Sequence, residues 1–150
     1  MGSMRNRLFR LGNTVAVGLY RSTGGRVGGK AKGGSPVLLL TVAGRKSGQL
    51  HTTPVAYVHH DGAYHLAASA GGQPREPQWI RNLRVAPRAT VQVGSTVIPV
   101  SVEVLEGAER DAAWSDVIVA TFPFFGDYEK TSGRRIAVAR LTPVGDPAAG

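Results

Sequence analysis

The segment Gly44-Arg45-Lys46-Ser47-Gly48 gathers three hydrogen-bond donors between two glycines. Glycine lets the backbone turn sharply and expose its N–H groups. The guanidinium of Arg45, the ammonium of Lys46 and the hydroxyl of Ser47 then share one short arc, a combination that suits a phosphate or a carboxylate. A solvated hairpin loop with ordinary surface charges is the alternative. The segment therefore indicates an anion site without specifying its ligand.

A second candidate group combines small residues with one face of a short helix. Residues 67–72 (AASAGG) end an apolar stretch. Their small side chains leave room for a flat ring, although tight loop packing would give the same pattern. Trp79 and Asn82 follow at a spacing of three, which places them on one helix face. Trp79 is more often a core residue than a ligand contact, whereas Asn82 needs a hydrogen-bond partner if it is buried.

Residues 122–128 (FPFFGDY) place four aromatic rings within seven positions. Phe122, Phe125 and Tyr128 recur at spacings of three, but a proline, a glycine and an aspartate stand between them. We therefore expect a loop rather than a continuous helix. Such a loop could wall an apolar substrate site or move as a lid. A hydrophobic cluster without a ligand is the alternative.

Other motifs indicate no chemistry. Residues 24–31 (GGRVGGKA) approach the phosphate-binding loop of NTPases, but Ala31 stands where a magnesium-binding hydroxyl is needed, and no strand precedes the segment. His59 and His60 are neighbours on opposite strand faces, so we expect no metal site. The chain has no cysteine, which excludes disulfides and thiolate ligands.

The elements that must position these groups are antiparallel strand pairs with a few helices. The predicted strands cover residues 37–42, 52–58, 63–69, 90–93, 96–104 and 135–141. Asp61-Gly62 and Gly94-Ser95 are typical of hairpin turns. Pro99 indicates that its strand is an edge or carries a bulge. Glu76-Pro77 opens a short helix that stops before Pro87, and a further helix surrounds Trp114 over 109–121. This order predicts an α+β chain, mainly β, with a closed or half-closed barrel.

Positive charge is concentrated at the start of the chain. The formal net charge is +8, and the residues before Ser35 include no acid. The basic residues of this part are Arg5, Arg7, Arg10, Arg21, Arg26, Lys30 and Lys32. Residues 4–21 also carry a stripe formed by Leu8, Leu11, Val15 and Leu19, which predicts an amphipathic helix. This arm either contacts an anionic membrane or docks on the barrel.

The expected organisation has four parts. Residues 1–3 are typical of a cloning scar. Residues 4–35 form a basic helix and a glycine-rich, flexible linker. Residues 36–143 form the barrel, and residues 144–150 are a tail. No apolar run approaches the roughly 18 residues of a membrane span, so a cytoplasmic protein is expected, with membrane association through the arm as the open alternative.

Several segments together resemble the deazaflavin-dependent nitroreductase family of actinobacteria. They are residues 39–48 (LLTVAGRKSG), 54–57 (PVAY), 67–69 (AAS), 77–83 (PQWIRNL) and Pro87, continued by 122–128 and 135–143. The resemblance implies an FMN-binding-protein-like split β-barrel with flanking helices. It also implies coenzyme F420, an 8-hydroxy-5-deazaflavin, as the hydride donor. The acceptor would be a planar, hydrophobic, conjugated molecule such as a quinone, an enone or a nitro compound.

The resemblance also implies residue roles. The cofactor-binding positions are Arg45, Lys46, Ser47, His51, Pro54, Ala67, Ala68, Ser69, Pro77, Trp79 and Asn82. The first three hold the phosphate and tail, residues 67–69 lie along the deazaflavin ring, and the last three support the ring edge. The substrate pocket is lined by Phe122, Phe125 and Tyr128. Tyr128 and Ser69 are the candidate catalytic residues, and no metal is expected.

Three departures from the family pattern bear on the ligands. His51 replaces an arginine that grips the cofactor tail, and Ala70 replaces a frequent lysine, although Arg75 could compensate. Phe122 and Phe125 replace tyrosines of the substrate pocket. Loss of their hydroxyls favours a quinone or another apolar acceptor over a nitroimidazole.

Two other functions remain open. An FMN-dependent oxidoreductase on the same barrel would use a similar basic turn for the flavin phosphate. A small basic β-barrel that binds nucleic acid is less favoured, because the strands do not interleave cations with aromatic residues. The sequence leaves the oligomeric state open.

Overall fold

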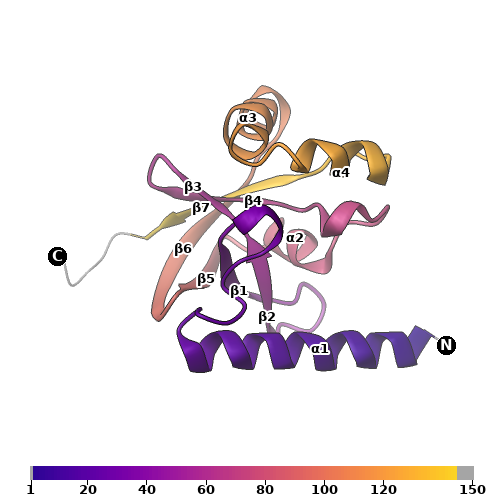
Figure 1. Ribbon diagram of the computed structural model, residues 1–150, viewed down its shortest axis with the longest axis vertical. Helices are drawn as coiled ribbons and strands as arrows, with labels where there is room; N and C mark the ends of the chain where they lie inside the picture. The colour runs from indigo at the N-terminus through magenta and orange to yellow at the C-terminus, as the bar shows by residue number, and fades with distance from the viewer. Residues whose placement is uncertain (1, 145–150) are drawn as a thin grey trace.

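The computed structural model describes the backbone of residues 2–144 and the side chains of residues 13–144. A curled antiparallel sheet with strand order β2-β1-β5-β6-β7-β4-β3 forms its centre (Figure 1). The strands are β1 (Val37–Ala43), β2 (Leu50–Ala56), β3 (Val58–His60), β4 (Ala63–Ala67), β5 (Arg88–Val93), β6 (Thr96–Val104) and β7 (Val138–Pro143). The helices are α1 (Gly2–Thr23), α2 (Gln78–Leu83), α3 (Gly107–Ala112), the π-helical η3 (Ala113–Val119) and α4 (Phe125–Ser132). Two short 3-10 turns are η1 (Lys32–Gly34) and η2 (Ala70–Gly72).

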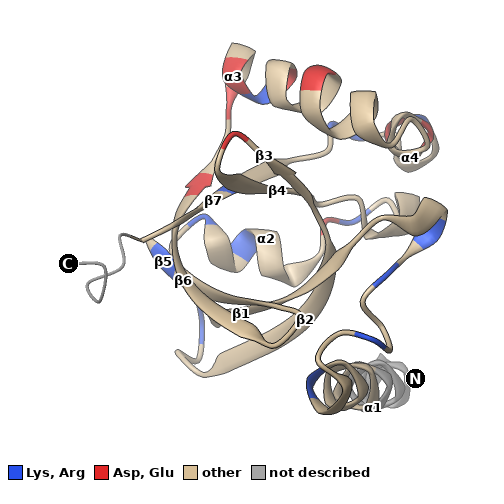
Figure 2. Cartoon of the chain, turned by 60° about the vertical axis from the view of Figure 1, so that its left-hand side comes forward, with Lys and Arg blue, Asp and Glu red and all other residues tan. Residues whose placement is uncertain are grey.

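The sheet closes because β2 and β3 follow one another in the chain but occupy opposite ends of the strand order. Only Tyr57 separates them. Its N–H donates to the carbonyl of Pro36 at 2.9 Å. At this residue the edge strand β2 ends, and β3, the strand at the other edge of the sheet, begins. The predicted single strand over 52–58 is therefore wrong, because it is two strands. Viewed along the barrel, the strands form a ring within which α2 is seen (Figure 2).

β1 is buried on both faces, which explains its uninterrupted apolar run. Leu38, Leu40 and Val42 face the barrel interior, where they join Ile80 and Leu83 of α2 in one cluster. The opposite side of the strand packs against α1. That second contact is made by Val37 and Leu39 of β1 with Val17 and Tyr20 of α1. The short predicted helix at 77–83 is confirmed, with Pro77 immediately before its first residue.

The two predicted hairpins are confirmed. Asp61 (φ 53°) and Gly62 (φ 78°) both have positive φ, as a type I′ turn requires, and Gly94 (φ 59°) opens the second turn. Pro99, however, is not on an edge strand, because β6 lies between β5 and β7. It lies where β7 ends: its carbonyl accepts from the N–H of Val144 at 2.9 Å, just beyond the last paired residues. The missing N–H of the proline therefore faces the end of β7.

The predicted loop over 122–128 is also wrong, because α4 starts within it. Gly126 lies inside this helix even though glycine lowers helix stability by about 1 kcal/mol relative to alanine. Burial supplies the compensation: Phe125 is 6% exposed, and its ring stacks on Phe124 with a centroid distance of 4.7 Å. The predicted helix around Trp114 is present as α3 continued by η3.

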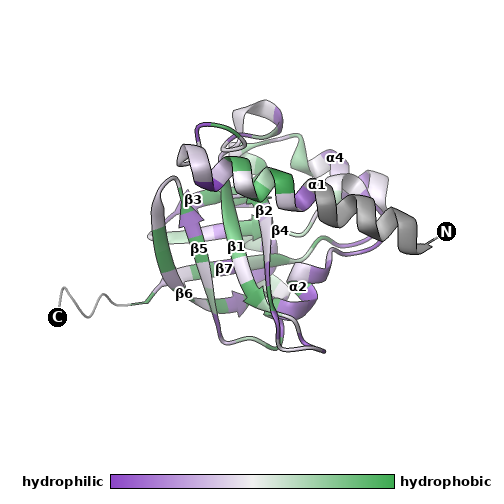
Figure 3. Cartoon of the chain, turned by 90° about the horizontal axis from the view of Figure 1, so that it is seen from below, coloured by the Kyte–Doolittle hydropathy of each residue, from purple (hydrophilic) through white to green (hydrophobic). Residues whose placement is uncertain are grey.

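α1 lies across the outside of the sheet (Figure 3). It docks there by the face opposite to the predicted apolar stripe. The hydroxyl of Tyr20 accepts from the N–H of Gly94 at 2.9 Å and donates to the carbonyl of Val37 at 2.9 Å. Val15 (53% exposed) and Leu19 (46% exposed) face outward. The side chains of the predicted stripe and basic cluster before residue 13 lie outside the described residues. So do Met1, the first residue of the predicted cloning scar, and residues 145–150 of the predicted tail.

The glycine-rich segment between α1 and β1 has a defined path. The N–H of Gly25 donates to the carbonyl of Tyr20 at 2.9 Å, and Lys30 forms an isolated antiparallel bridge with Pro36. This path brings Lys32 of η1 over the rings of Phe124 and Tyr128, with its Nζ 5.3 Å and 5.4 Å from their centroids.

Within the described residues, no helix is both long and apolar enough to cross a membrane.

Candidate functional site

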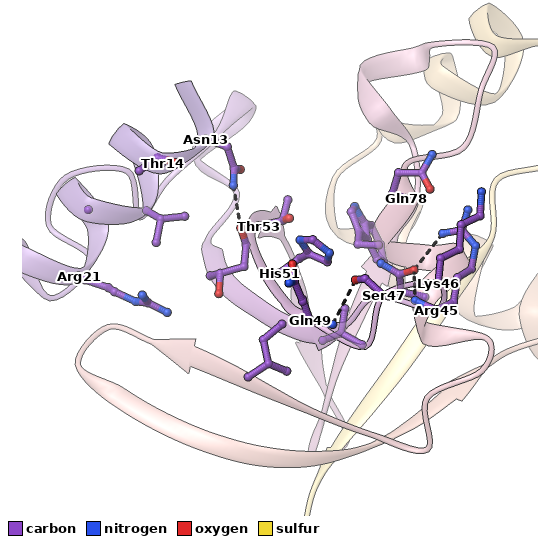
Figure 4. Close-up of a pocket in the computed structure, with 18 residues that line it drawn as sticks. Asn13, Thr14, Arg21, Arg45, Lys46, Ser47, Gln49, His51, Thr53 and Gln78 are labelled. Atoms are coloured by element: carbon purple, nitrogen blue, oxygen red, sulfur yellow. Dashed lines mark hydrogen bonds between the residues drawn. The ribbon is translucent and has the colours of Figure 1, made fainter. Parts of the chain in front are cut away.

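A cleft of about 990 Å³ lies between α1, the turn that joins β1 to β2, β2 and the start of α2 (Figure 4). α1 forms one wall and the β1–β2 turn with α2 forms the other. Its lining residues include Asn13, Thr14, Arg21, Arg45, Lys46, Ser47, His51, Thr53, Gln78, Trp79 and Asn82. This volume is at the upper end of the range for ligand pockets in proteins.

The β1–β2 turn is held closed by its own backbone. The N–H of Gly44 donates to the carbonyl of Gln49 at 2.7 Å, and the N–H of Gly48 donates to that of Gly44 at 2.8 Å. The hydroxyl of Ser47 accepts from the N–H of Gln49 at 3.1 Å. A Cβ at Gly44 would lie 2.9 Å from Nε2 of His51, so any other residue there would displace the imidazole of His51. The turn is therefore closed at its base, and the side chains of residues 45 and 46 line the cleft.

Asn82 fixes this turn to α2. Its side chain is buried (5% exposed), because Ile80 and Leu83 anchor the same helix in the barrel interior. Its Oδ1 accepts from the backbone N–H of Arg45 at 3.1 Å and from Nη1 of the same residue at 2.9 Å. The expectation that a buried Asn82 needs a partner is met by the basic turn itself. The guanidinium of Arg45 is thereby held at the wall of the cleft.

The cleft has positive charges without acidic neighbours. Arg21, Arg45 and Lys46 line it, and none of the described lining residues is acidic. Glu76, which precedes α2, is engaged elsewhere: both its carboxylate oxygens accept from Arg84 at 2.7 Å. These hydrogen bonds lower the pKa of Glu76 below its usual value. Uncompensated cations in a concave site favour an anionic ligand.

A second group of predicted residues lies at the end of β4. Ala67, Ala68 and Ser69 are all buried. The carbonyl of Ser69 accepts from Nη2 of Arg134 at 3.1 Å, and Nε of Arg134 donates to the carbonyl of Gln73 at 3.1 Å. Arg134 therefore holds both ends of the η2 turn. In Figure 1 this turn lies between α4 and α2.

The aromatic residues of α4 and of the segment just before it pack next to this strand end. Phe122, Phe125 and Tyr128 share a cluster with Ala67. The ring of Tyr128 meets that of Phe125 edge-on at 5.6 Å, and Nζ of Lys32 lies 5.4 Å from the centroid of the Tyr128 ring. The segment thus forms a packed aromatic cluster on a helix, which a cation from η1 covers.

Comparison with known proteins gives a consistent result. A sequence model of the F420H(2)-dependent quinone reductase family matches residues 13–143. The chain is 34% identical over 126 residues to an F420H(2)-dependent quinone reductase of Mycobacterium tuberculosis, covering 83% of this chain and 85% of the relative. The solved structure of an F420-H2 dependent reductase, FDR-A, is 34% identical, with a TM-score of 0.62 over 71% of this chain and 93% of that chain.

The chain belongs to the F420H(2)-dependent quinone reductase family. The resemblance found in the sequence and the split-barrel fold class are thereby confirmed. A further solved structure, described as a domain-swapped dimer, is 29% identical with a TM-score of 0.65 over 93% of this chain and 97% of that chain. A FAD-binding protein of Mesorhizobium loti shares the fold at 18% identity and a TM-score of 0.53, covering 73% of this chain and 79% of that chain.

The predicted site residues fall into two groups, one in the cleft and one near the end of β4. The cleft brings together Arg45, Lys46, Ser47, His51, Trp79 and Asn82. The strand end, α4 and the segment before α4 hold the others, none of which lines the cleft: Ala67, Ala68, Ser69, Phe122, Phe125 and Tyr128. Pro54 and Pro77 also lie outside the cleft lining. Pro54 pairs with Leu39 in the sheet, and Pro77 precedes α2.

Sequence reasoning missed the contribution of α1 to the cleft. Arg75, the expected substitute for a missing cation, does not line the cleft, whereas Arg21 does. Thr14, Gly18 and Arg21 recur at spacings of four and three, which is the signal of a shared helix face. That signal is present in the sequence, but the apolar stripe at Val15 and Leu19 on another face is the stronger one.

The contact between Asn82 and Arg45 can be tested by hydrogen exchange. Asn82→Ala removes the acceptor, so we expect the Arg45 amide to exchange about tenfold faster or more. The free energy of unfolding should fall by about 1–3 kcal/mol, the usual loss when a buried hydrogen-bond partner is removed. Gln78→Ala on the exposed side of the same helix is the matched control. Unchanged exchange at Arg45 in Asn82→Ala would contradict the assigned contact.

Proposed function

We propose that this chain binds coenzyme F420 through the cleft and reduces a planar, quinone-type acceptor with F420H2. The observation that supports it best is the charge of the cleft. Its three cationic lining residues have no acidic neighbour among the described lining residues. Family membership supplies the chemistry, and the cleft supplies a place for a phosphate and an acidic tail.

The residues present fit such a group. Arg45, Lys46 and Ser47 offer charged and neutral donors from one turn, and charge-assisted hydrogen bonds to phosphate are among the strongest in proteins. Asn82 holds Arg45 in place, so little side-chain freedom is lost when an anion binds. When bound, the reduced deazaflavin would donate a hydride, so two electrons would be transferred in one step. The protein's task is therefore to position the two partners and exclude water.

The ring end of the cofactor is proposed to lie along residues 67–69. The side chains of this strand end are small enough for a flat ring to lie along them, and the chain continues from it through η2 to α2, which lines the cleft. Arg134 keeps this connection in one conformation by binding the carbonyls of Ser69 and Gln73. Ser69 itself is buried (8% exposed) and is proposed to contact the ring.

The acceptor is proposed to contact the aromatic cluster formed by Phe122, Phe125 and Tyr128. The half-buried ring of Phe122 offers apolar surface to a planar acceptor, the buried ring of Phe125 packs behind it, and neither carries a donor. The hydroxyl of Tyr128 is the donor proposed to stabilise negative charge on an acceptor oxygen. This arrangement favours a quinone over a nitro compound, and an enone would use the same donor.

The alternative cofactor, FMN, carries a phosphate that the same turn could bind. F420 is favoured because the cleft extends from the turn to α1 and has cations on both walls. FMN ends at its phosphate, so it would leave the far wall without a partner. Nucleic-acid binding finds no support in this arrangement, since the cations line a cleft and not a face of stacked aromatic rings.

Cofactor choice can be measured by fluorescence titration. Wild-type protein should bind F420 at least about tenfold more tightly than FMN, a difference of about 1.4 kcal/mol. Lys46→Ala should weaken F420 binding by about tenfold or more, because a charge-assisted contact contributes about 1.5–3 kcal/mol. Lys30→Ala removes an exposed cation outside the cleft and should have little effect. Equal or tighter FMN binding would overturn the choice of cofactor.

The role of Tyr128 can be measured with menadione as the acceptor. Tyr128→Phe should lower turnover by about tenfold or more, somewhat less than the loss of a typical oxyanion-binding donor, because water can substitute. F420 affinity should stay within about twofold. Tyr64→Phe, on β4 and away from the cluster, is the matched control. Wild-type turnover in Tyr128→Phe would leave the cluster with a packing role only.

The exposed face of α1 is proposed to contact anionic membranes. Val15 and Leu19 face outward on a helix whose other side is docked, and the chain up to residue 60 has no acid to repel anionic lipid. Sedimentation with vesicles rich in an anionic phospholipid should capture the wild type at low salt and release it at high salt. The double variant Val15→Ser, Leu19→Ser should lose capture while still binding F420. Equal capture by both proteins would refute the contact.

A further inference from the structure

Arg21 lies on the wall of the cleft opposite the basic turn. It extends from α1 into the space that Gln49 and His51 border on the other side (Figure 4). The cations of the cleft therefore come from two elements that are far apart in the sequence. The β1–β2 turn contributes Arg45 and Lys46, and α1 contributes Arg21.

Among the described residues, Arg21 has no acidic partner. No Asp or Glu occurs before Asp61 in the sequence. None of the ion pairs among the described residues involves Arg21. Figure 2 shows acidic residues on α3 and β6, whereas the described part of α1 and the segment after it carry only basic ones. The charge of Arg21 is thus available to a ligand.

The backbone that carries Arg21 is fixed although the side chain is exposed. The adjacent Tyr20 is 2% exposed and binds both β1 and the β5–β6 turn through its hydroxyl. Nδ2 of Asn13 donates to the carbonyl of Thr52 at 2.7 Å, which attaches α1 to β2 as well. These attachments to β1, the β5–β6 turn and β2 hold α1 on the barrel. A docked arginine loses less freedom on binding an anion than one on a loose arm.

We infer that Arg21 is a binding residue for the anionic tail of the cofactor, and that α1 is part of the cofactor site. This inference rests on the proposed function. Arg45 and Lys46 hold the phosphate at one wall, and Arg21 binds the carboxylate-bearing end of the tail across the cleft. Arg21 is the cation that α1 contributes to that wall of the cleft. The N-terminal arm then has a role in cofactor affinity that is independent of any membrane contact.

A structural role is the competing explanation. Arg21 lies in the last turn of α1, where a cation interacts favourably with the helix dipole. Such a role would lower thermal stability on substitution but would not distinguish ligands by their tails. The test must therefore separate affinity for the tail from affinity for the ring and from folding.

The experiment is a titration of wild type, Arg21→Gln and Arg26→Gln with two ligands. The first ligand is F420, and the second is 8-hydroxy-5-deazariboflavin, which has the ring but neither phosphate nor tail. Arg21→Gln should weaken F420 binding by about tenfold at low salt, equivalent to about 1.4 kcal/mol. The difference should shrink at high salt because exposed charges are screened. Binding of the tail-free ligand should change by less than about twofold.

Arg26→Gln removes the same charge just after α1, outside the cleft lining, and should leave F420 binding within about twofold of wild type. Equal F420 affinity of Arg21→Gln and wild type would overturn the inference and leave the proposed function intact. Equal losses for both ligands would also overturn it, since they would show a structural effect. If the wild type binds the tail-free ligand but not F420, the proposed function and the inference both fail.

Discussion

The burial of β1 on both faces is the constraint on which the rest of the site depends. Its inner side chains pack with Ile80 and Leu83 of α2, and its outer side chains pack with Val17 and Tyr20 of α1. α1 and α2 carry the two walls of the cleft, and β1 runs directly into the basic turn between them. A central strand with a solvated outer face would leave α1 without a docking surface. The same apolar run therefore fixes the fold and the separation of the cations.

Polar contacts then fix the two elements of the cleft walls that apolar packing alone does not hold in place. Oδ1 of Asn82 holds the turn through the backbone and the guanidinium of Arg45, while the hydroxyl of Tyr20 holds α1. Both groups are buried, so each would be destabilising without its partner. Neither contact neutralises a charge. The fold thus keeps the cations of the cleft without acidic partners among the described residues. Their positive charges repel one another, and a bound anion would offset this repulsion.

The hairpins and the short helix at 77–83 could be predicted because their signals are local. Asp61-Gly62 requires positive φ whatever surrounds it, and Trp79, Ile80 and Leu83 define one apolar helix face. The break at Tyr57 could not be predicted, since it depends on a hydrogen bond to Pro36 from a distant edge. α4 was missed because the packing of Phe125 outweighs an unfavourable glycine. In the site, the turn and Asn82 were found as donors, but their contact and the wall formed by α1 depend on tertiary structure.

The separation between the anion-binding cleft and the aromatic cluster matches the two ends of the proposed ligand. A deazaflavin cofactor carries a flat, nearly neutral ring at one end and acidic groups at the other, and no single environment suits both. Cations beside the ring would have to be paired or solvated, and aromatic side chains beside the tail would desolvate its charges. The chain between Ser69 and Gln78 joins the two environments, and Arg134 limits its conformations through two backbone carbonyls. Because Arg134 belongs to the segment that follows α4, the spacing of ring and tail sites is coupled to the element that is proposed to receive the acceptor.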